Sequence, residues 1–425
     1  MARLKHQLPQ LDELPPLMKF KLPTLDRRAA RLASAANIWD LRKIAKRRTP
    51  TPAFDYTDGG AQDETTLNRS YQLLREITLI PKILHSTPEV DLSTTIAGGL
   101  SSLPFGIAPT GFTRFMQSEG EDAGASAAAK AGIPFSLSTM GTRSVEEVAR
   151  VSEAKQNSKP GSGRRWFQLY LWKDREASKD LLERAQKEGF DTLLATVDTP
   201  VAGQRLRDTR NGMTIPPQLT AKTVLDASYR PEWWFNFLTT DPLTFAPLPD
   251  TAADLPTILN SMFDPSLSIE DLKWIREVWK GPLFVKGILT PEDTRRAVDA
   301  GADGLIVSNH GGRQLDRCPV SIQALTEVRK AAGPDVEIIL DSGVMSGADI
   351  VAALGLGADF VIVGRAYLYG LMAGGEQGVD KTIQLVAEEA RNSMLLMDTR
   401  TIEDLKNSGQ VIAPWLDKND DNVEA

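Results

Sequence analysis

The chain has 425 residues, of which 41% are hydrophobic and 25% charged, so it can bury a large core as an ordinary globular protein does. Its formal net charge of −7 argues against a nucleic-acid binder, because such proteins carry a basic balance. Cys318 is the only cysteine, which excludes an intramolecular disulfide and a cysteine-based metal cluster; we expect no metal site and a reducing, cytoplasmic setting.

The N-terminal part of the chain is expected to be a helical extension spanning residues 1–100, with 38–48 as its clearest helix. Residues 1–20 alternate charges and prolines and lack the apolar core of a signal peptide. No run of the sequence reaches the roughly 18 apolar residues that a spanning helix needs. We therefore expect a protein that at most lies on the surface of a membrane.

Residues 101–400 alternate short apolar runs, rich in β-branched and aromatic residues, with helical patterns. The eight runs are 105–108, 133–137, 166–171, 192–197, 283–285, 304–307, 337–340 and 360–363. Their near-continuous apolar character predicts strands buried on both faces, as in a parallel sheet. The helical patterns have start signals, such as Ser144 three residues before Glu147, and glycines such as Gly132 at their ends. Eight such alternations predict an α/β fold, a (β/α)8 TIM barrel; an open doubly wound sheet is the alternative.

Two segments stand outside this rhythm. Residues 200–270 form a long insertion after the fourth predicted strand, and residues 401–425 are expected to be a C-terminal tail with an acidic end. Within the insertion, four aromatic residues fall between positions 233 and 237. Such a stretch favours a bilayer interface, packing over the barrel mouth, or a subunit contact. The segment 229–246 is thus a candidate membrane-surface segment.

The carboxyl ends of the predicted strands carry polar residues, and in a barrel of this type the site is built there. The residues at these ends, with a polar or charged one at nearly every strand, are Pro109, Thr110, Gly111, Ser138, Thr139, Gln168, Tyr170, Thr196, Asp198, Lys286, Ser308 to Arg313, Asp341, Ser342, Gly343, Gly364 and Arg365. A purely structural barrel would not need them, so together they predict a functional site.

The ends of the seventh and eighth strands have the composition of an anion site. Glycines let backbone N–H groups approach closely, helix N-termini favour an anion, and Arg365 can donate two hydrogen bonds to a phosphate. A turn with a solvated cation is the alternative for Gly364-Arg365. We expect a phosphate here.

Two further strand ends carry residues with acid–base or electrostatic capacity. Lys286 ends an apolar strand, where an ammonium needs an anionic or electron-rich partner; a structural salt bridge is the alternative. Of the three histidines, His6 and His85 lie in the extension, whereas His310 follows a strand and can titrate near neutral pH. His310 is therefore the candidate catalytic base, and Asp198 is the candidate partner that orients it.

The run Ser308-Asn309-His310-Gly311-Gly312-Arg313-Gln314-Leu315-Asp316 resembles the signature of the FMN-dependent α-hydroxy-acid oxidizing family. Similar motifs stand in family order at 54–56, 59–61, 107–111, 166–170 and 196–200, and the likeness covers roughly residues 35–400. The chain looks most like the quinone-dependent L-lactate dehydrogenases of actinobacteria. The resemblance implies FMN as cofactor, oxidation of an L-2-hydroxy acid such as L-lactate to the 2-oxo acid pyruvate, and transfer of the electrons to a quinone or another acceptor. It also implies a homo-oligomer, peripheral on the cytoplasmic face of the cell membrane.

The resemblance assigns a role to each candidate residue. His310 is the base, with Asp198 beside it. The substrate is bound by Arg205, Arg313, Tyr56 and Tyr170, of which the first three hold its carboxylate and the last faces its hydroxyl. The residues along the flavin ring and side chain are Pro109, Thr110, Gly111, Ser138, Gln168, Thr196 and Lys286, with Lys286 against the N1/O2 edge. The residues that hold the ribityl phosphate are Ser308, Asp341, Gly343, Gly364 and Arg365.

The sequence departs from the family pattern at two of these places. Met345 stands where the family often has a phosphate-binding arginine, and Met140 stands where a tryptophan often lies beside the substrate. Gly111 leaves room near the substrate methyl group. Three alternative functions are considered: an oxidase of the same family that uses oxygen, a flavin-dependent barrel isomerase, and a non-enzymatic binding protein. The two arginines and His310 argue against the isomerase, and the polar strand ends argue against the binding protein.

Overall fold

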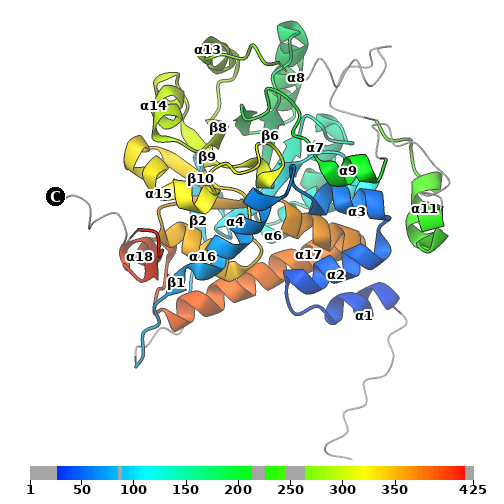
Figure 1. Cartoon of the computed structure of the whole chain (residues 1–425), viewed down its shortest axis with the longest axis horizontal. Helices are drawn as coiled ribbons and strands as arrows, with labels where there is room; N and C mark the ends of the chain where they lie inside the picture. The colour runs from blue at the N-terminus through cyan, green and yellow to red at the C-terminus, as the bar shows by residue number, and fades with distance from the viewer. Residues whose placement is uncertain (1–25, 85–88, 213–224, 227, 245–263, 417–425) are drawn as a thin grey trace, which may run out of the picture.

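A computed structural model describes residues 26–84, 89–212, 225–226, 228–244 and 264–416. His6, His85, the end of the chain from 417, and positions 245 and 246 of the candidate membrane segment lie outside the described residues. The centre of the molecule is a closed barrel of eight parallel strands in which each strand pairs with its neighbours in the sequence and the last pairs with the first (Figure 1). The predicted (β/α)8 barrel is confirmed. Its strands are β4 (Phe105–Thr110), β5 (Phe135–Ser138), β6 (Arg165–Leu169), β7 (Thr192–Thr196), β8 (Leu283–Ile288), β9 (Gly304–Val307), β10 (Glu337–Leu340) and β11 (Phe360–Val363).

On the outside of the barrel, at least one helix follows each of the eight strands. These helices are α5 (Thr113–Met116), α6 (Gly120–Ala131), α7 (Val145–Ala154), α8 (Arg175–Lys187), α13 (Ile269–Val278), α14 (Pro291–Asp299), α15 (Ser321–Ala332), α16 (Gly347–Gly355) and α17 (Arg365–Leu396). Ser144 and Glu147 form the expected capping box at the start of α7, and Gly132 ends α6 with a φ of 76°.

Several strands run further than their apolar residues. β5 continues to Ser138, which pairs with Gln168, and β8 continues through Lys286, which pairs with Thr196. The backbone ladder does not depend on the side chain, so a strand continues into residues whose polar groups face the mouth of the barrel. The candidate residues thus sit on strands, which hold them more rigidly than loops would.

The amino-terminal end of the barrel is filled by a hairpin of β2 (Thr94–Ile96) and β3 (Gly99–Ser101). Ile96 belongs to the same buried cluster as Trp166 and Phe360, which lie inside the barrel. The guanidinium of Arg164 donates to the carbonyl of Ile96 at 2.9 Å and fastens the hairpin. The barrel is therefore closed at this end by packed side chains.

The N-terminal extension contains α1 (Arg27–Ala33), α2 (Ile38–Arg48), α3 (Thr51–Asp58) and α4 (Thr65–Glu76), followed by β1 (Thr78–Leu79). Figure 1 shows α2 lying along α17, and the two helices are in contact.

Part of the expected C-terminal tail is ordered structure. Residues 402–407 form α18 (Ile402–Asn407), which contacts α16, and β12 (Val411–Ile412) pairs with β1. The apolar residues Ile402 and Leu405 of α18 are buried, which explains why this stretch packs on the body.

Two helices of the insertion are described, α9 (Leu206–Arg210) and α11 (Pro231–Thr239). α11 lies at the periphery of the molecule (Figure 1). Its Trp233 stacks on Phe237 and donates from Nε1 to the carbonyls of Phe115 and Met116 in α5, each at 3.2 Å. One face of α11 is thus packed against the barrel. None of the described helices is both long and apolar enough to cross a membrane.

Candidate active site

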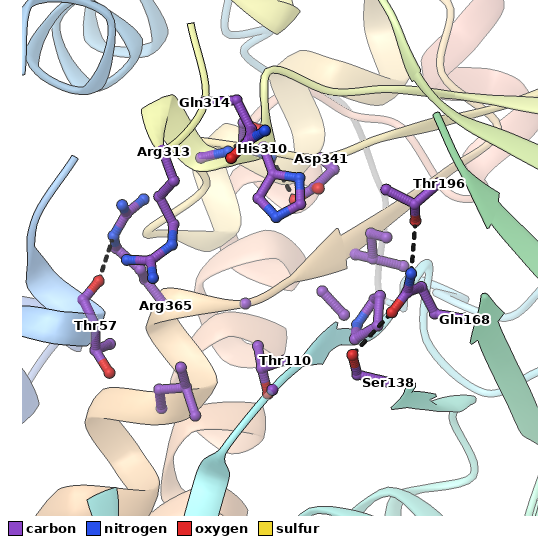
Figure 2. Close-up of a pocket in the computed structure, with 18 of the residues that line it drawn as sticks. Thr57, Thr110, Ser138, Gln168, Thr196, His310, Arg313, Gln314, Asp341 and Arg365 are labelled. Atoms are coloured by element: carbon purple, nitrogen blue, oxygen red, sulfur yellow. Dashed lines mark hydrogen bonds between the residues drawn. The ribbon is translucent and has the colours of Figure 1, made fainter. Parts of the chain in front are cut away.

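A cavity of about 320 Å³ opens at the carboxyl ends of the barrel strands (Figure 2). Its size is within the range of small-molecule sites. Every strand contributes to its lining, directly or through the residues that follow it: Thr110, Ser138, Gln168, Thr196, Lys286, His310, Asp341 and Gly364. Of the predicted site residues, only Asp198 and Ser308 do not line the cavity, and both contact residues that do.

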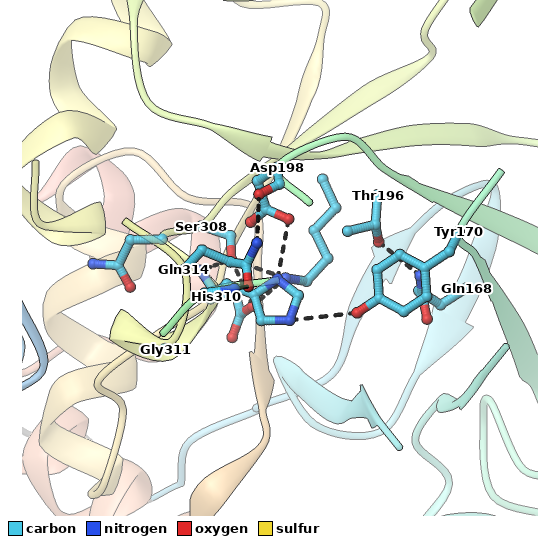
Figure 3. Close-up of polar contacts among 12 residues, drawn as sticks. Gln168, Tyr170, Thr196, Asp198, Ser308, His310, Gly311 and Gln314 are labelled. Carbon is cyan, nitrogen blue, oxygen red and sulfur yellow. Dashed lines mark hydrogen bonds and ion pairs between the residues drawn. The ribbon is translucent and has the colours of Figure 1, made fainter. Parts of the chain in front are cut away.

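His310 and Asp198 form a pair at this mouth (Figure 3). Nδ1 of His310 lies 3.0 Å from Oδ1 of Asp198, and Nε2 lies 3.4 Å from the hydroxyl of Tyr170. Burial alone would raise the pKa of Asp198, but the charge and hydrogen bond of His310 hold it below its usual value. A carboxylate only accepts hydrogen bonds, so Nδ1 donates to it; in the neutral imidazole, Nε2 is then the acceptor on the side of the cavity.

The backbone around His310 is bent to present this ring. His310 has a φ of 56°, and the backbone N–H of Gly311 donates to the hydroxyl of Ser342 at 2.9 Å. A left-handed conformation costs a residue other than glycine roughly 1–2 kcal/mol, so the surrounding hydrogen bonds must hold it. On the neighbouring strand, Gly287 has a φ of 113°, and a Cβ there would lie 2.6 Å from the Cβ of Asp198. Glycine at 287 therefore lets Asp198 approach the imidazole.

Two arginines converge on the ring of Tyr56. The guanidinium carbons of Arg313 and Arg205 lie 4.8 and 5.2 Å from its centroid. Burial and the charge of Arg205 lower the pKa of Arg313 to about 10, so it stays protonated at neutral pH. Arg205 is paired with Asp208 at 3.0 Å, and Arg313 donates to the carbonyl of Tyr56. An anion placed between the two guanidiniums would relieve their repulsion.

Lys286 has an anionic partner inside the barrel. Its Nζ lies 2.9 Å from Oδ2 of Asp341 and 2.9 Å from the hydroxyl of Ser308. The salt bridge that the sequence left as an alternative is therefore present, and both charged residues also line the cavity. Burial alone would lower the pKa of Lys286, but the carboxylate of Asp341 raises it above its usual value. The wall of the cavity therefore carries an ammonium here, paired with the carboxylate of Asp341.

The end of β11 leads directly into a helix N-terminus. α17 begins at Arg365, and its N-cap, Gly364, supplies no side-chain cap. The guanidinium of Arg365 donates to the carbonyls of Thr57 at 2.8 Å and Gly59 at 2.7 Å, which orients it (Figure 2). Gly343, with a φ of 84°, lines the same part of the cavity. A helix N-terminus beside a guanidinium is a favourable site for an anion.

Among the lining residues that were not singled out from the sequence are Thr57 and Tyr71, whereas Gln314 and Ser342 belong to strand-end segments that were. Gln314 donates to the carbonyls of Asp198 and Val201 at 3.1 and 2.9 Å, and so joins the loops after β7 and β9. Because Gln314 belongs to the run 308–316, the sequence already indicates that it lies near the site. Tyr71 lies on α4, whose amphipathic pattern is that of any helix packed on a core, so nothing in the sequence distinguishes it.

The loop that carries Asp341 and Gly343 is held by a second carboxyl group, that of Asp349, which accepts from the backbone N–H of Met345 at 2.8 Å. Burial raises the pKa of Asp349 to about 6. Because this is above the value of 3.8 in the unfolded chain, its stabilising contribution is complete below about pH 4 and is lost as the pH rises through about 6.

We expect Asp349→Asn to remove this pH dependence. Relative to the wild type, the variant should gain on the order of 3 kcal/mol in the free energy of unfolding between about pH 4 and about pH 8. Denaturant titrations of both proteins across this range measure it. A constant difference between the two curves would mean that Asp349 titrates as an ordinary carboxyl group.

The barrel and its cavity define a (β/α)8 enzyme with its site at the carboxyl ends of the strands. The model of the FMN-dependent dehydrogenase family matches residues 45–412, and the chain belongs to this family. It is 52% identical over 402 residues, 95% of either chain, to a Mycobacterium tuberculosis protein whose provisional name is L-lactate dehydrogenase. It is 42% identical to the L-lactate dehydrogenase of Xanthobacter autotrophicus, over 88% of this chain and 95% of that one.

Solved structures agree with this placement. The crystal structure of the monotopic membrane protein (S)-mandelate dehydrogenase is similar with a TM-score of 0.83 and 35% identity, covering 89% of this chain and 100% of that one. A mandelate oxidase structure is similar with a TM-score of 0.75 and 34% identity, covering 89% and 98%. The protein is an FMN-dependent dehydrogenase, and FMN is its cofactor.

The residues of the cavity fit this cofactor. Among the residues that the structure describes, the cations Arg205, Lys286, Arg313 and Arg365 line it against the single carboxylate of Asp341, although the whole chain is acidic. The uncapped start of α17 suits a phosphate. On the opposite wall, Ser138 donates to Oε1 of Gln168 at 2.8 Å and Nε2 of Gln168 donates to Thr196 at 2.9 Å, an ordered polar edge for a heteroaromatic ring (Figure 2).

Proposed function

We propose that the protein oxidises L-lactate to pyruvate and passes the two electrons to a quinone. The observation that carries this proposal is the convergence of the His310–Asp198 pair and two guanidiniums on one cavity. A 2-hydroxy acid needs a carboxylate anchor, a base and an electron acceptor. The names of the relatives support lactate as the substrate.

The carboxylate of the substrate is bound by Arg313 and Arg205, helped by the hydroxyl of Tyr56. Planar guanidiniums bind a carboxylate with two directed hydrogen bonds each, which an ammonium cannot do. Binding between these two cations also fixes which face of the substrate carbon meets the base. The geometry around the ring of Tyr56 supports this assignment.

His310 accepts a proton from the bound substrate at Nε2. The carboxylate of Asp198 orients the ring through Nδ1 and stabilises the imidazolium that results. Tyr170 faces the substrate hydroxyl, and its own pKa is raised by burial and by Asp198, so it keeps its proton. FMN, when bound, supplies the two-electron acceptor that no side chain provides.

The cofactor is held by residues from every side of the cavity. Those along the ring and its side chain are Pro109, Thr110, Gly111, Ser138, Gln168, Thr196 and Lys286. Those around the phosphate are Ser308, Asp341, Gly343, Gly364 and Arg365. Ser308 acts there through Asp341, since its hydroxyl donates to Oδ2 of that carboxylate at 2.9 Å.

The outer face of α11 supports a membrane-bound acceptor. Phe235 and Leu238 of α11 are 66% and 67% exposed, and Tyr229, just before the helix, is 84% exposed, whereas Trp233 and Phe237 pack toward the barrel. Exposed aromatic and leucine side chains on one helix face suit the interface of a bilayer, where quinones reside. The similar (S)-mandelate dehydrogenase is itself called a monotopic membrane protein. We propose that the enzyme is peripheral on the cytoplasmic face of the cell membrane and that it forms a homo-oligomer.

Replacing the outward side chains should separate membrane binding from catalysis. Phe235→Glu with Leu238→Glu is expected to weaken sedimentation with phosphatidylcholine–phosphatidylglycerol vesicles at least about tenfold, because two apolar side chains no longer enter the interface. Dye-linked oxidation of L-lactate should be unchanged. The control is Thr239→Glu with Thr240→Glu, which adds the same charge at exposed polar positions. Equal binding by both variants and the wild type would exclude α11 as the membrane contact.

The similarity to a mandelate oxidase makes oxygen the competing acceptor. Peroxide formed per L-lactate consumed, measured with and without a soluble quinone, distinguishes the two. We expect little peroxide and a rate that rises with quinone. One peroxide per lactate, with no response to quinone, would assign the protein as an oxidase.

A further inference from the structure

We infer that the buried carboxylate of Asp58 is a positioning element of the active site, which fixes Arg205 toward the substrate through the neighbouring Arg207. The inference deepens the proposed function, since it rests on Arg205 as a carboxylate ligand. None of the three residues of this link is part of the barrel: Asp58 ends α3, and the two arginines belong to the insertion.

Asp58 accepts four hydrogen bonds while being only 5% exposed. Arg42 of α2 donates to both of its oxygens, at 2.6 and 2.8 Å, Arg207 of α9 donates at 2.8 Å, and the hydroxyl of Tyr369 of α17 donates at 2.7 Å. Burial alone would raise the pKa of this carboxyl group, but the bonds from Arg42 and Tyr369 lower it, so it is ionised. A single carboxylate thus joins the extension, the insertion and the last barrel helix.

Arg207 connects this carboxylate to the start of α9. Its guanidinium donates to Asp58 and to Glu64, and α9 contacts α3 (Figure 1). The residue that precedes α9 as its N-cap is Arg205, whose guanidinium lies over Tyr56. α9 is only 5 residues long and buries none of them, so packing alone does not fix its place. The ion pairs of Arg207 supply that restraint, together with the hydrogen bond that Asn211, the C-cap of α9, donates to Asp55 of α3 at 2.8 Å.

The backbone of the same segment holds the other arginines of the cavity. The carbonyl of Tyr56 accepts from Arg313, and those of Thr57 and Gly59 accept from Arg365. The backbone of residues 56–59 therefore holds one substrate arginine, Arg313, and the phosphate arginine, Arg365. Removing one partner of a buried ion pair leaves an uncompensated charge, so the segment cannot keep its position after such a change.

The test uses the FMN-loaded enzyme and oxalate. Oxalate is a dicarboxylate without a hydroxyl-bearing carbon, so it can bind at the site but cannot be oxidised as a hydroxy acid. The dissociation constant of oxalate is read from the change in flavin absorbance, and KM and kcat for L-lactate are measured beside it. Arg207→Gln should raise the Kd of oxalate and the KM of lactate about tenfold, which corresponds to about 1.4 kcal/mol, and lower kcat less than about threefold. Arg207→Lys should restore part of the affinity, because an ammonium can still donate to Asp58.

A double-mutant comparison assigns the effect to Asp58. If Arg207 acts through Asp58, the variant Asp58→Asn with Arg207→Gln binds oxalate no more weakly than Asp58→Asn alone. Additive losses would overturn the inference and point to Glu64 instead. The matched control is Arg317→Gln, which breaks an exposed ion pair with Asp63 on the same side of the molecule and should change neither constant.

Other outcomes are also decisive. Equal falls in kcat, FMN content and oxalate affinity in Arg207→Gln would mean a merely structural role and would contradict the inference. A wild-type enzyme that binds oxalate but does not oxidise L-lactate would overturn the proposed substrate and leave the positioning test intact. Absence of oxalate binding by the wild type would contradict the carboxylate site on which the inference rests.

Discussion

His310→Gln is expected to retain FMN and to lose its reduction by L-lactate, with kcat lowered about a thousandfold to ten-thousandfold. Glutamine can still donate a hydrogen bond toward Asp198, so the loop keeps its shape, but its amide does not accept a proton near neutral pH. The hydrogen bonds of the imidazole go to Asp198 and Tyr170, neither of which is proposed to hold FMN. The measurement is the absorbance of the bound flavin after anaerobic mixing with L-lactate.

A chemical reductant provides the control for this variant. Dithionite should bleach the flavin of His310→Gln as it does that of the wild type, because the cofactor itself is intact. Near-normal bleaching by L-lactate would remove His310 from the role of base. Loss of the yellow colour on purification would instead show that the residue holds the cofactor.

Arg313→Met is expected to lower kcat/KM for L-lactate by about a hundredfold to ten-thousandfold. The change removes a guanidinium that lies beside Tyr56 and leaves Arg205, which is already paired with Asp208. Loss of one partner of a desolvated, hydrogen-bonded charge pair costs roughly 3–5 kcal/mol. Arg313→Lys should be intermediate, since it keeps the charge without the planar pair of donors. Initial rates over a range of lactate concentrations separate KM from kcat.

Arg317→Met serves as the matched control for this prediction. It removes an arginine of the same loop whose side chain is 72% exposed. We expect unchanged kinetics in the control. A loss in Arg313→Met no larger than that in Arg317→Met would mean that Arg313 does not bind the substrate.

The barrel could be predicted from the sequence because its signals are local. Runs such as 304–307, 337–340 and 360–363 are apolar on both faces and end where the structure ends β9, β10 and β11. The predicted runs 133–137 and 283–285 end before β5 and β8 do. Ser138 and Lys286 continue the hydrogen-bonded ladder of these strands with polar side chains. A run of apolar residues indicates where side chains are buried, but the backbone pairing of a strand continues past that run into the site.

Much of the cavity could be predicted for a geometric reason. Parallel strands of a barrel end at one face, so residues after separate strands, such as Asp198 and His310, are brought together by the fold. What the sequence did not reveal comes from outside the barrel. Asp58 and Tyr71 both belong to the extension: Tyr71 lines the cavity and Asp58 accepts from Arg207, and their positions depend on how α3 and α4 pack on the body. Tertiary packing of this kind leaves no local pattern.

The most direct test of the proposed function is anaerobic mixing of the wild-type enzyme with a panel of L- and D-2-hydroxy acids, followed by the absorbance of the flavin. We predict rapid and complete bleaching by L-lactate, slower bleaching by longer L-2-hydroxy acids, and none by D-lactate. Full retention of the oxidised flavin spectrum with every acid of the panel would contradict the assignment of this cavity to 2-hydroxy-acid oxidation.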